Sequence, residues 1–391
     1  MNNHSVVKTV PLHCYTNKKT FIVENIQSEE YFEMPGVCIE AIELLNQGKF
    51  LQEIQVQLEN TYHNEDVDIY DFVTQLCDLN LISIIDGQQF NVEEENTKSK
   101  KSLINDIPSS IGKIFFNSIS YLIYGTILLA NIYLLFKSPE LIPTYKDFFV
   151  FDSMVFNVLS MMLVSIFFAM LHEFGHIIAA RSFDIPTNLG VSNRLFLIVS
   201  EADMTHAWKL SKAKRNILYL GGLCVDNLFL FLALISQIYW TGPLIVEAFF
   251  ALIVFDISIK IIYQFCIYMK TDFYYVIENS TGCHNLIENC NYYLLRKIPF
   301  INSGKANDIF KGEERIVRWY SLFYFCGVLV TLLVFLGFII PQIIFSLTLT
   351  VPNLFLSFSD PMFWDALLFV MQIVLWSVLI VFSLYKKYVL R

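Results

Sequence analysis

The amino-acid sequence predicts an α-helical integral membrane protein with about six transmembrane helices, preceded by a small α+β domain that resembles a winged helix. The first observation is composition: 55% of the 391 residues are hydrophobic, 16% are charged, and the mean hydropathy is +0.51. Soluble domains are rarely so apolar. The second observation is that apolar runs long enough to cross about 30 Å of hydrocarbon recur beyond residue 110, whereas residues 1–95 contain none.

Six apolar runs are candidates for membrane spans, because each has the roughly 20 residues that a spanning helix needs. The second run is longer than a perpendicular helix requires, which indicates that part of it is tilted or lies along the interface. The predicted spans are 111–136, 148–180, 216–240, 243–268, 319–348 and 361–385.

Basic residues divide the loops between these spans into two kinds. The segment before the first span contains "KSKK", and the loops after the second and fourth spans are rich in Lys and Arg, whereas "TGP" after the third span has none. By the positive-inside rule, both termini are expected on the cytoplasmic side. The net charge of -9 and the lack of a basic array argue against a nucleic-acid partner.

Residues 1–95 are the predicted N-terminal domain, and the polar linker 96–110 joins them to the membrane domain, 111–391. Strand-forming residues fill "TFIVEN" and "EYFEM". Helices are predicted at "PGVCIEAIELLNQG", at "FLQEIQVQLENTY", where Val56 is among the apolar residues at near-helical spacing, and at "VDIYDFVTQLCDLNLI". "LISIIDGQQFNV" is typical of two short strands joined by an Asp-Gly turn.

The second span ends in "HEFGH", which contains His172, Glu173 and His176. Histidines four residues apart point to the same side of a helix, so both imidazoles can bind one Zn²⁺ with Glu173 beside the open position. In this arrangement the glutamate takes a proton from water that attacks a peptide carbonyl and later gives a proton to the leaving amine. Ionisable groups inside a bilayer are costly, which favours a functional role over a chance motif.

A catalytic zinc usually has three protein ligands, so the motif leaves one to be found. The candidates are Asp272 after the fourth span, Asp256 deeper in that span, Asp226 on the third span and His206 in a polar loop. For Asp256 the alternative is an ion pair with Lys260, which lies one helical turn away.

The motif and its surroundings resemble the site-2 protease family of intramembrane zinc metalloproteases over roughly residues 160–295, with the core expected at about 148–295. "HEFGH" resembles the family's HExGH. "SEADMTHAWKLSKAKRNILYLGGLCVDN" resembles its segment leading into a glycine-rich second core helix, and "TDFYYVIENSTGCHNL" resembles its DGYY segment with a later Asn-Leu pair. The resemblance implies zinc as the cofactor, His172, His176 and Asp272 as its ligands, and Glu173 as the catalytic acid and base.

Two positions depart from the family's pattern. Phe273 stands where the family has a glycine after the aspartate, which removes backbone freedom near the metal. The family's Gly-x-x-x-Asn element corresponds to Gly222 with Asp226 and Asn227. Because an amide can donate an N–H to an oxyanion and a carboxylate cannot, Asn227 is the expected catalytic side chain.

Between the second and third spans, "NRLFLIVS" at 193–200 is a short apolar run rich in strand-forming residues. We expect a membrane-dipping strand that holds substrate in an extended form, as an edge strand does in the family. An ordinary amphipathic loop is the alternative, because short apolar runs are ambiguous.

Residues 10–95 resemble the PqqD-like domain, a leader-peptide recognition element, in "YFEMPGVCIEAIELL" and "VDIYDFVTQLCDLNLI". The two resemblances imply a multi-pass protein of the bacterial cell membrane that cleaves a peptide or membrane-associated substrate near the cytoplasmic face, during maturation of a ribosomally synthesised bacteriocin or signalling peptide. The expected partners are that substrate, the lipid bilayer, and peptide-maturation or export proteins. The alternative is a non-catalytic membrane protein, a peptide-binding, immunity or export factor, that retains the protease fold.

Overall fold

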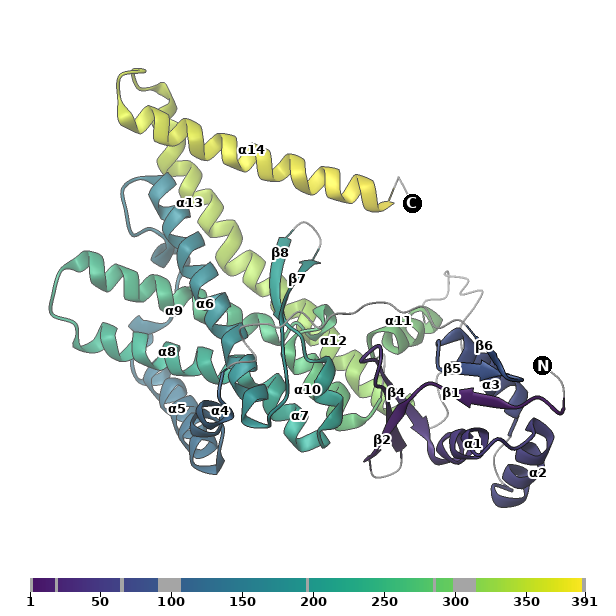
Figure 1. The fold of residues 1–391 in the computed structure, drawn as a ribbon. Coiled ribbons are helices and arrows are strands. Elements are labelled where there is room, and N and C mark those ends of the chain that lie inside the picture. Colours follow the sequence, from purple (N-terminus) through teal and green to yellow (C-terminus); the bar gives the residue numbers. More distant parts are fainter. Residues whose placement is uncertain are drawn as a thin grey trace. The chain divides into compact units, whose positions relative to one another are not determined.

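The chain divides into two compact units, which we call the N-terminal unit and the helical unit (Figure 1). The N-terminal unit is Met1–Leu103 together with Met204–Ser211, and the helical unit is Ile104–Asp203 with Lys212–Arg391. The computed structural model describes residues 3–17, 20–63, 67–90, 107–194, 197–283, 286–297 and 314–388. Most of the predicted linker at 96–110 lies outside the described residues.

The N-terminal unit combines two antiparallel three-stranded sheets with three helices, as an α+β domain should. One sheet has the order β1-β5-β6 and the other β2-β3-β4. All the predicted strands and helices of this unit are present, and β1 and β2 are additional. The elements are β1 (Val7–Thr9), β2 (Leu12–Asn17), β3 (Thr20–Asn25), β4 (Tyr31–Pro35), α1 (Gly36–Asn46), α2 (Leu51–Thr61), α3 (Ile69–Asp78), β5 (Ile82–Ile85) and β6 (Gln88–Gln89).

Local sequence explains how these elements begin and turn. The Asp68 carboxylate accepts hydrogen bonds from the backbone N–H groups of Tyr70 and Asp71, at 2.9 and 3.0 Å, and so caps the start of α3. Asp86 and Gly87, with φ of 49° and 81°, make the predicted two-residue turn between β5 and β6.

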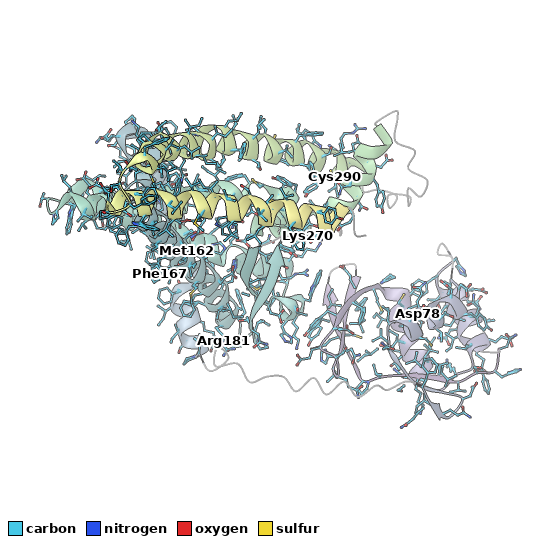
Figure 2. All side chains as sticks on the ribbon, turned by 90° about the horizontal axis from the view of Figure 1, so that it is seen from above. Asp78, Met162, Phe167, Arg181, Lys270 and Cys290 are labelled. Atoms are coloured by element: carbon cyan, nitrogen blue, oxygen red, sulfur yellow. The ribbon has the colours of Figure 1, made fainter. Side chains whose placement is uncertain are left out.

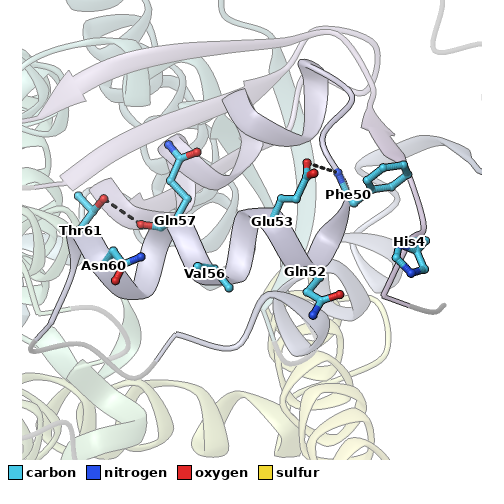
Figure 3. Close-up of a pocket in the computed structure, with 8 residues that line it drawn as sticks. All are labelled: His4, Phe50, Gln52, Glu53, Val56, Gln57, Asn60 and Thr61. Carbon is cyan, nitrogen blue, oxygen red and sulfur yellow. Dashed lines mark hydrogen bonds between the residues drawn. The ribbon is translucent and has the colours of Figure 1, made fainter.

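Helix α2 buries one face and exposes the other. Leu51, Ile54 and Leu58 are buried in the core of the N-terminal unit, whereas Val56 is 52% exposed, so its predicted place on the apolar face is wrong. Val56 and the ring of Phe50 instead line an open hollow of about 770 Å³ on the outer face of α2 (Figure 3). This hollow is lined by residues of the N-terminal unit, whereas the predicted motif residues belong to the helical unit.

A buried glutamate holds the segment Met204–Ser211 to the sheet β2-β3-β4. The Glu24 carboxylate accepts hydrogen bonds from the hydroxyls of Tyr15 and Tyr31, both at 2.7 Å, and lies 2.8 Å from the ammonium of Lys209. Burial by itself would raise the pKa of Glu24, but these partners outweigh burial and hold that pKa below its ordinary value. His206 lies 2.9 Å from the Tyr31 hydroxyl through Nδ1, within the N-terminal unit.

The helical unit is a bundle in which α6 packs on α8 and α4, and α8 packs on α9 and α5 (Figure 1). A two-stranded antiparallel hairpin, β7 with β8, follows α6, and it replaces the single predicted strand at 193–200. The elements are α4 (Ser109–Phe115), α5 (Ser118–Lys137), α6 (Met154–Ser182), β7 (Leu189–Arg194), β8 (Leu197–Ala202), α7 (Lys212–Tyr219), α8 (Gly221–Tyr239), α9 (Leu244–Gln264), α10 (Asp272–Thr281), α11 (Leu286–Lys297), α12 (Glu314–Val334), α13 (Ile340–Thr350) and α14 (Pro361–Tyr388).

Five helices of the described chain are long and apolar enough to cross a membrane, where the sequence predicted about six. The difference is α9, which corresponds to the predicted span 243–268 and has three charged residues, Glu247, Asp256 and Lys260, within its 21 residues. The predicted run 319–348 lies within one 42-residue helical stretch, Glu314–Phe355. These helices are consistent with a helical membrane protein.

Helix α6 has an apolar exposed face and a buried face that carries the polar groups. Leu163 and Phe167, four residues apart, are 64% and 56% exposed, as is typical of side chains that contact lipid. Met162, Phe167 and Arg181 mark successive levels of this helix in Figure 2. A residue of α14 caps the start of α6. The Asp365 carboxylate accepts a hydrogen bond from the backbone N–H of Met154 at 2.8 Å.

Candidate metal centre

The two histidines of the motif meet on the buried face of α6. His172 and His176 are one helical turn apart, and their Nε2 atoms approach to 3.2 Å. His176 is 4% exposed, and the His172 side chain is 12% exposed. The spacing of four residues therefore places both imidazoles side by side, as the sequence predicts.

The first residue of α10 completes a group of three. Asp272 Oδ2 lies 3.0 Å from Nε2 of His172 and 3.5 Å from Nε2 of His176. Within the described ranges, these three residues are the one group of at least three His, Cys, Asp or Glu side chains whose potential ligand atoms all lie within 4.8 Å of one another. Ligands on a tetrahedral zinc with bonds of about 2.0 to 2.1 Å are about 3.3 Å apart, so the observed separations suit that ion.

Both imidazoles are oriented through their second nitrogen. His172 Nδ1 is 2.7 Å from Oδ2 of Asp226, and His176 Nδ1 is 2.8 Å from the carbonyl oxygen of Leu218. The oxygen in each contact can accept a hydrogen bond from Nδ1–H, and Nε2 of the same ring, when it carries no proton, turns its lone pair toward Asp272. Metal-binding histidines are commonly held in this way by a carboxylate or backbone carbonyl.

Close packing of α6 against α8 requires two glycines at the centre. A Cβ placed on Gly175 would lie 2.6 Å from the backbone oxygen of Gly221, and one placed on Gly222 would lie 2.5 Å from Cε1 of His172. Such distances are far below van der Waals contact. Gly222 and Asp226 are four residues apart on α8, so the same face of the helix makes room for His172 and supplies its hydrogen-bond partner.

Glu173 lies beside His172 in the chain and contacts the hairpin. Its Oε2 accepts a hydrogen bond of 2.8 Å from the backbone N–H of Ala202, the last residue of β8. Glu173 is partly exposed. One carboxylate oxygen is thus held by the strand end, which fixes the side chain next to the histidines without using it as a ligand.

The surroundings of Asp272 favour its ionised form. Burial alone would raise the pKa of this carboxyl group, but the adjacent His176 and His172 outweigh burial and lower that pKa. The turn before Asp272 uses Lys270, which adopts a left-handed backbone with φ of 53°. Phe273 therefore needs no glycine-like freedom, because it already lies inside α10.

The structure separates the other predicted candidates from this group. Asp226 contacts His172 on the nitrogen away from Asp272, so it orients a histidine and is not among the three converging groups. Asp256 forms the alternative ion pair with Lys260, at 2.7 Å. His206 belongs to the N-terminal unit.

Asn227 is not brought to the metal centre. Its Nδ2 donates to the carbonyl oxygen of Tyr124 at 3.1 Å, and its Oδ1 accepts from Nδ2 of Asn131 at 2.9 Å. Both ends of the amide are therefore engaged with α5. Asn227 follows Asp226 by one residue and points about 100° away around the helix, which is why the expected oxyanion role does not fit.

Sequence reasoning did not find the role of Leu218, which contributes only its backbone oxygen, because no sequence pattern reveals such a contact. Gly222 was named through the resemblance, but its close packing against the His172 ring was not predicted.

Comparison with protein-family models, curated protein sequences and solved structures yields no match.

Proposed function

We propose that the protein is a zinc endopeptidase embedded in the membrane, of the site-2 protease type, with His172, His176 and Asp272 as the metal ligands. The observation that carries the proposal is the convergence of these three side chains with Glu173 adjacent. Two nitrogens and one carboxylate oxygen form a typical ligand set for catalytic zinc. In a site of three protein ligands, zinc lowers the pKa of water and polarises a carbonyl group.

The residues of the chain then have separate tasks. Asp226 and Leu218 hold the imidazoles so that both Nε2 atoms face the same point. Glu173 accepts the proton of the attacking water at its carboxylate and returns it to the leaving amine. Its hydrogen bond from the N–H of Ala202 keeps the carboxylate oriented while it does so.

The N-terminal unit supports recognition of a peptide. Strands β2 and β4 are the two edges of the sheet β2-β3-β4, and an extended peptide can add to such an edge through backbone hydrogen bonds. We therefore propose that this PqqD-like unit binds the leader of a ribosomally made peptide and that the helical unit cleaves the bound peptide. The protein would lie in a bacterial cell membrane with both termini on the cytoplasmic side.

A comparison of Glu173→Gln with the wild type tests the proposal. Both proteins should bind zinc, and only the wild type should cleave members of a quenched-fluorescent peptide library in detergent micelles. Glu247→Gln on α9, which changes an exposed carboxylate, is the matched control and should cleave normally. Full cleavage by Glu173→Gln would remove the catalytic assignment, and peptide binding without cleavage by the wild type would indicate the non-catalytic alternative.

A further inference from the structure

The last residue of α9 makes two hydrogen bonds to the start of α10. Gln264 Oε1 accepts from the backbone N–H of Asp272 at 3.0 Å, and the Gln264 carbonyl oxygen accepts from the Thr271 hydroxyl at 2.8 Å. Gln264 is 8% exposed and Thr271 is 5% exposed. These two bonds close the short connection that contains Lys270, which is labelled in Figure 2.

The first of these bonds satisfies a group that a helix leaves open. The N–H groups of the first turn have no partner within the helix, and a Ser or Thr at the N-cap usually accepts from them through its side chain. Thr271 is the N-cap of α10 and makes no such bond. The Thr271 hydroxyl instead donates to the carbonyl oxygen of Gln264. The side-chain amide oxygen of Gln264 accepts from the backbone N–H of Asp272 and so takes the role of the N-cap side chain.

The position of this cap matters because Asp272 is the first residue of α10 and also carries the carboxylate that meets the histidines. The turn before it contains Lys270 in a left-handed conformation, which an L-residue adopts at some cost. A connection with that conformation needs contacts that hold it. Gln264 supplies them at both Thr271 and Asp272.

We propose that Gln264 is a positioning residue of the metal centre, which acts through the backbone of Asp272 to place its carboxylate opposite His172 and His176. This inference rests on the proposed metal site and goes beyond it, because Gln264 is not itself a ligand. The amide oxygen of the side chain is the essential atom, since it accepts the N–H.

Metal titration of the purified full-length protein in detergent micelles tests the role. After chelation, Zn²⁺ affinity is measured by competition, and the visible spectrum of bound Co²⁺ reports the geometry of the ligands. Gln264→Leu should bind Zn²⁺ roughly 10- to 100-fold more weakly, the range found for residues that orient ligands. Gln264→Glu, which keeps an acceptor oxygen, should recover most of that affinity and the Co²⁺ spectrum.

Two further variants separate positioning from a general loss of structure. Gln237→Leu on α8 is the matched control, because its buried Oε1 has no hydrogen-bond partner among the described residues, and it should bind as the wild type does. Thr271→Val removes the second bond and should weaken Zn²⁺ binding in the same direction, even if Gln264→Leu fails to fold.

The outcomes distinguish this inference from the function it builds on. A wild type that binds neither metal contradicts the proposed function, and the role of Gln264 with it. A wild type that binds, together with a Gln264→Leu variant of equal affinity and an unchanged Co²⁺ spectrum, contradicts only the role of Gln264. A Gln264→Glu variant as weak as Gln264→Leu would show that the acceptor oxygen is not the essential atom.

Discussion

Two groups of ionisable side chains in the described part of the helical unit differ in how their charges are balanced. In the first, Asp256 and Lys260 pair at 2.7 Å, and the Lys260 ammonium also donates to the carbonyl oxygen of Ser165 at 2.9 Å. One positive and one negative charge are in contact and balance each other. Such a pair needs no ligand and is explained as a structural contact between α9 and α6.

The second group, His172, His176 and Asp272, has no such balance. Nδ1 of each ring contacts another oxygen, so the two Nε2 atoms and the Asp272 carboxylate converge within 3.0 to 3.5 Å of one another. Ligand atoms that meet in this way need a proton or a metal cation between them. The comparison teaches that burial of charge alone does not identify a site, whereas convergence of three ligand atoms does.

The largest expected effect separates the two aspartates. Asp272→Ala should abolish stoichiometric zinc binding, because it removes one of three protein ligands. Asp256→Ala should keep the zinc but lower the free energy of unfolding by about 3 kcal/mol, because it removes the carboxylate that pairs with Lys260, whose side chain is only 22% exposed. Zinc analysis and denaturant unfolding of both variants make the measurement. If Asp256→Ala also lost its metal, the two groups would be one functional unit.

A smaller effect is expected from the carboxylate behind the first histidine. Asp226→Ala leaves all three ligands in place but frees the His172 ring to rotate, so zinc affinity should fall about 10- to 100-fold. Competition with a chelator of known affinity measures the change. Complete loss of zinc in this variant would mean that Asp226 is itself a ligand, and an unaltered affinity would remove its orienting role.

Packing at the centre gives a third test. Gly222→Ala places a methyl group against the His172 ring, and overpacking of this kind costs about 1–3 kcal/mol, which should appear as weaker zinc binding. Gly125→Ala on α5 is the control, because nothing lies within 4 Å of its added Cβ. That variant should keep its zinc affinity and gain up to about 1 kcal/mol in helix stability. Equal affinities for both variants would contradict the close approach of α8 to His172.

The smallest expected effect concerns the Glu24 carboxylate, which should respond to pH and not to zinc. Because the pKa of Glu24 in the folded chain is lowered, its bonds stabilise the N-terminal unit above the ordinary pKa of 4.5 and are lost as the pH falls through the lower folded value. Hydrogen exchange of the backbone at 205–209 should therefore increase on acidification, after correction for intrinsic rates. Glu24→Gln should remove this pH dependence. Zinc should not alter the exchange of 205–209 at any pH.

The sequence predicts most of the fold because its signals are local. Apolar run length identifies the long helices, and the Asp86-Gly87 turn identifies the terminal hairpin. Helix α9 is not among the five long apolar helices because it has three charged residues, of which Asp256 and Lys260 form the ion pair that their spacing of four residues allows. The sequence also predicted one strand after α6 where the structure has two, because periodicity and length do not resolve very short strands.

Residues of the candidate site that lie close together in the sequence were easier to predict than those that lie far apart. His172, Glu173 and His176 follow from one helical spacing, whereas Asp272 comes from 100 residues away and rested on a resemblance. Asp226 and Asn227 are neighbours on α8 and point about 100° apart around the helix. Only the packing of α8 determines which of the two side chains faces the site. Gln264 acts on a backbone N–H and leaves no pattern in the sequence.

X-ray absorption at the zinc edge tests the central claim most directly, applied to full-length protein purified with its metal. The account predicts about one zinc per chain, surrounded by nitrogen and oxygen at about 2.0 to 2.2 Å, with a scattering signature of two imidazoles. The chain also has eight cysteines, which would bind zinc at about 2.3 Å through sulfur. Absence of zinc, or a zinc bound by sulfur, would contradict a metal centre built from His172, His176 and Asp272.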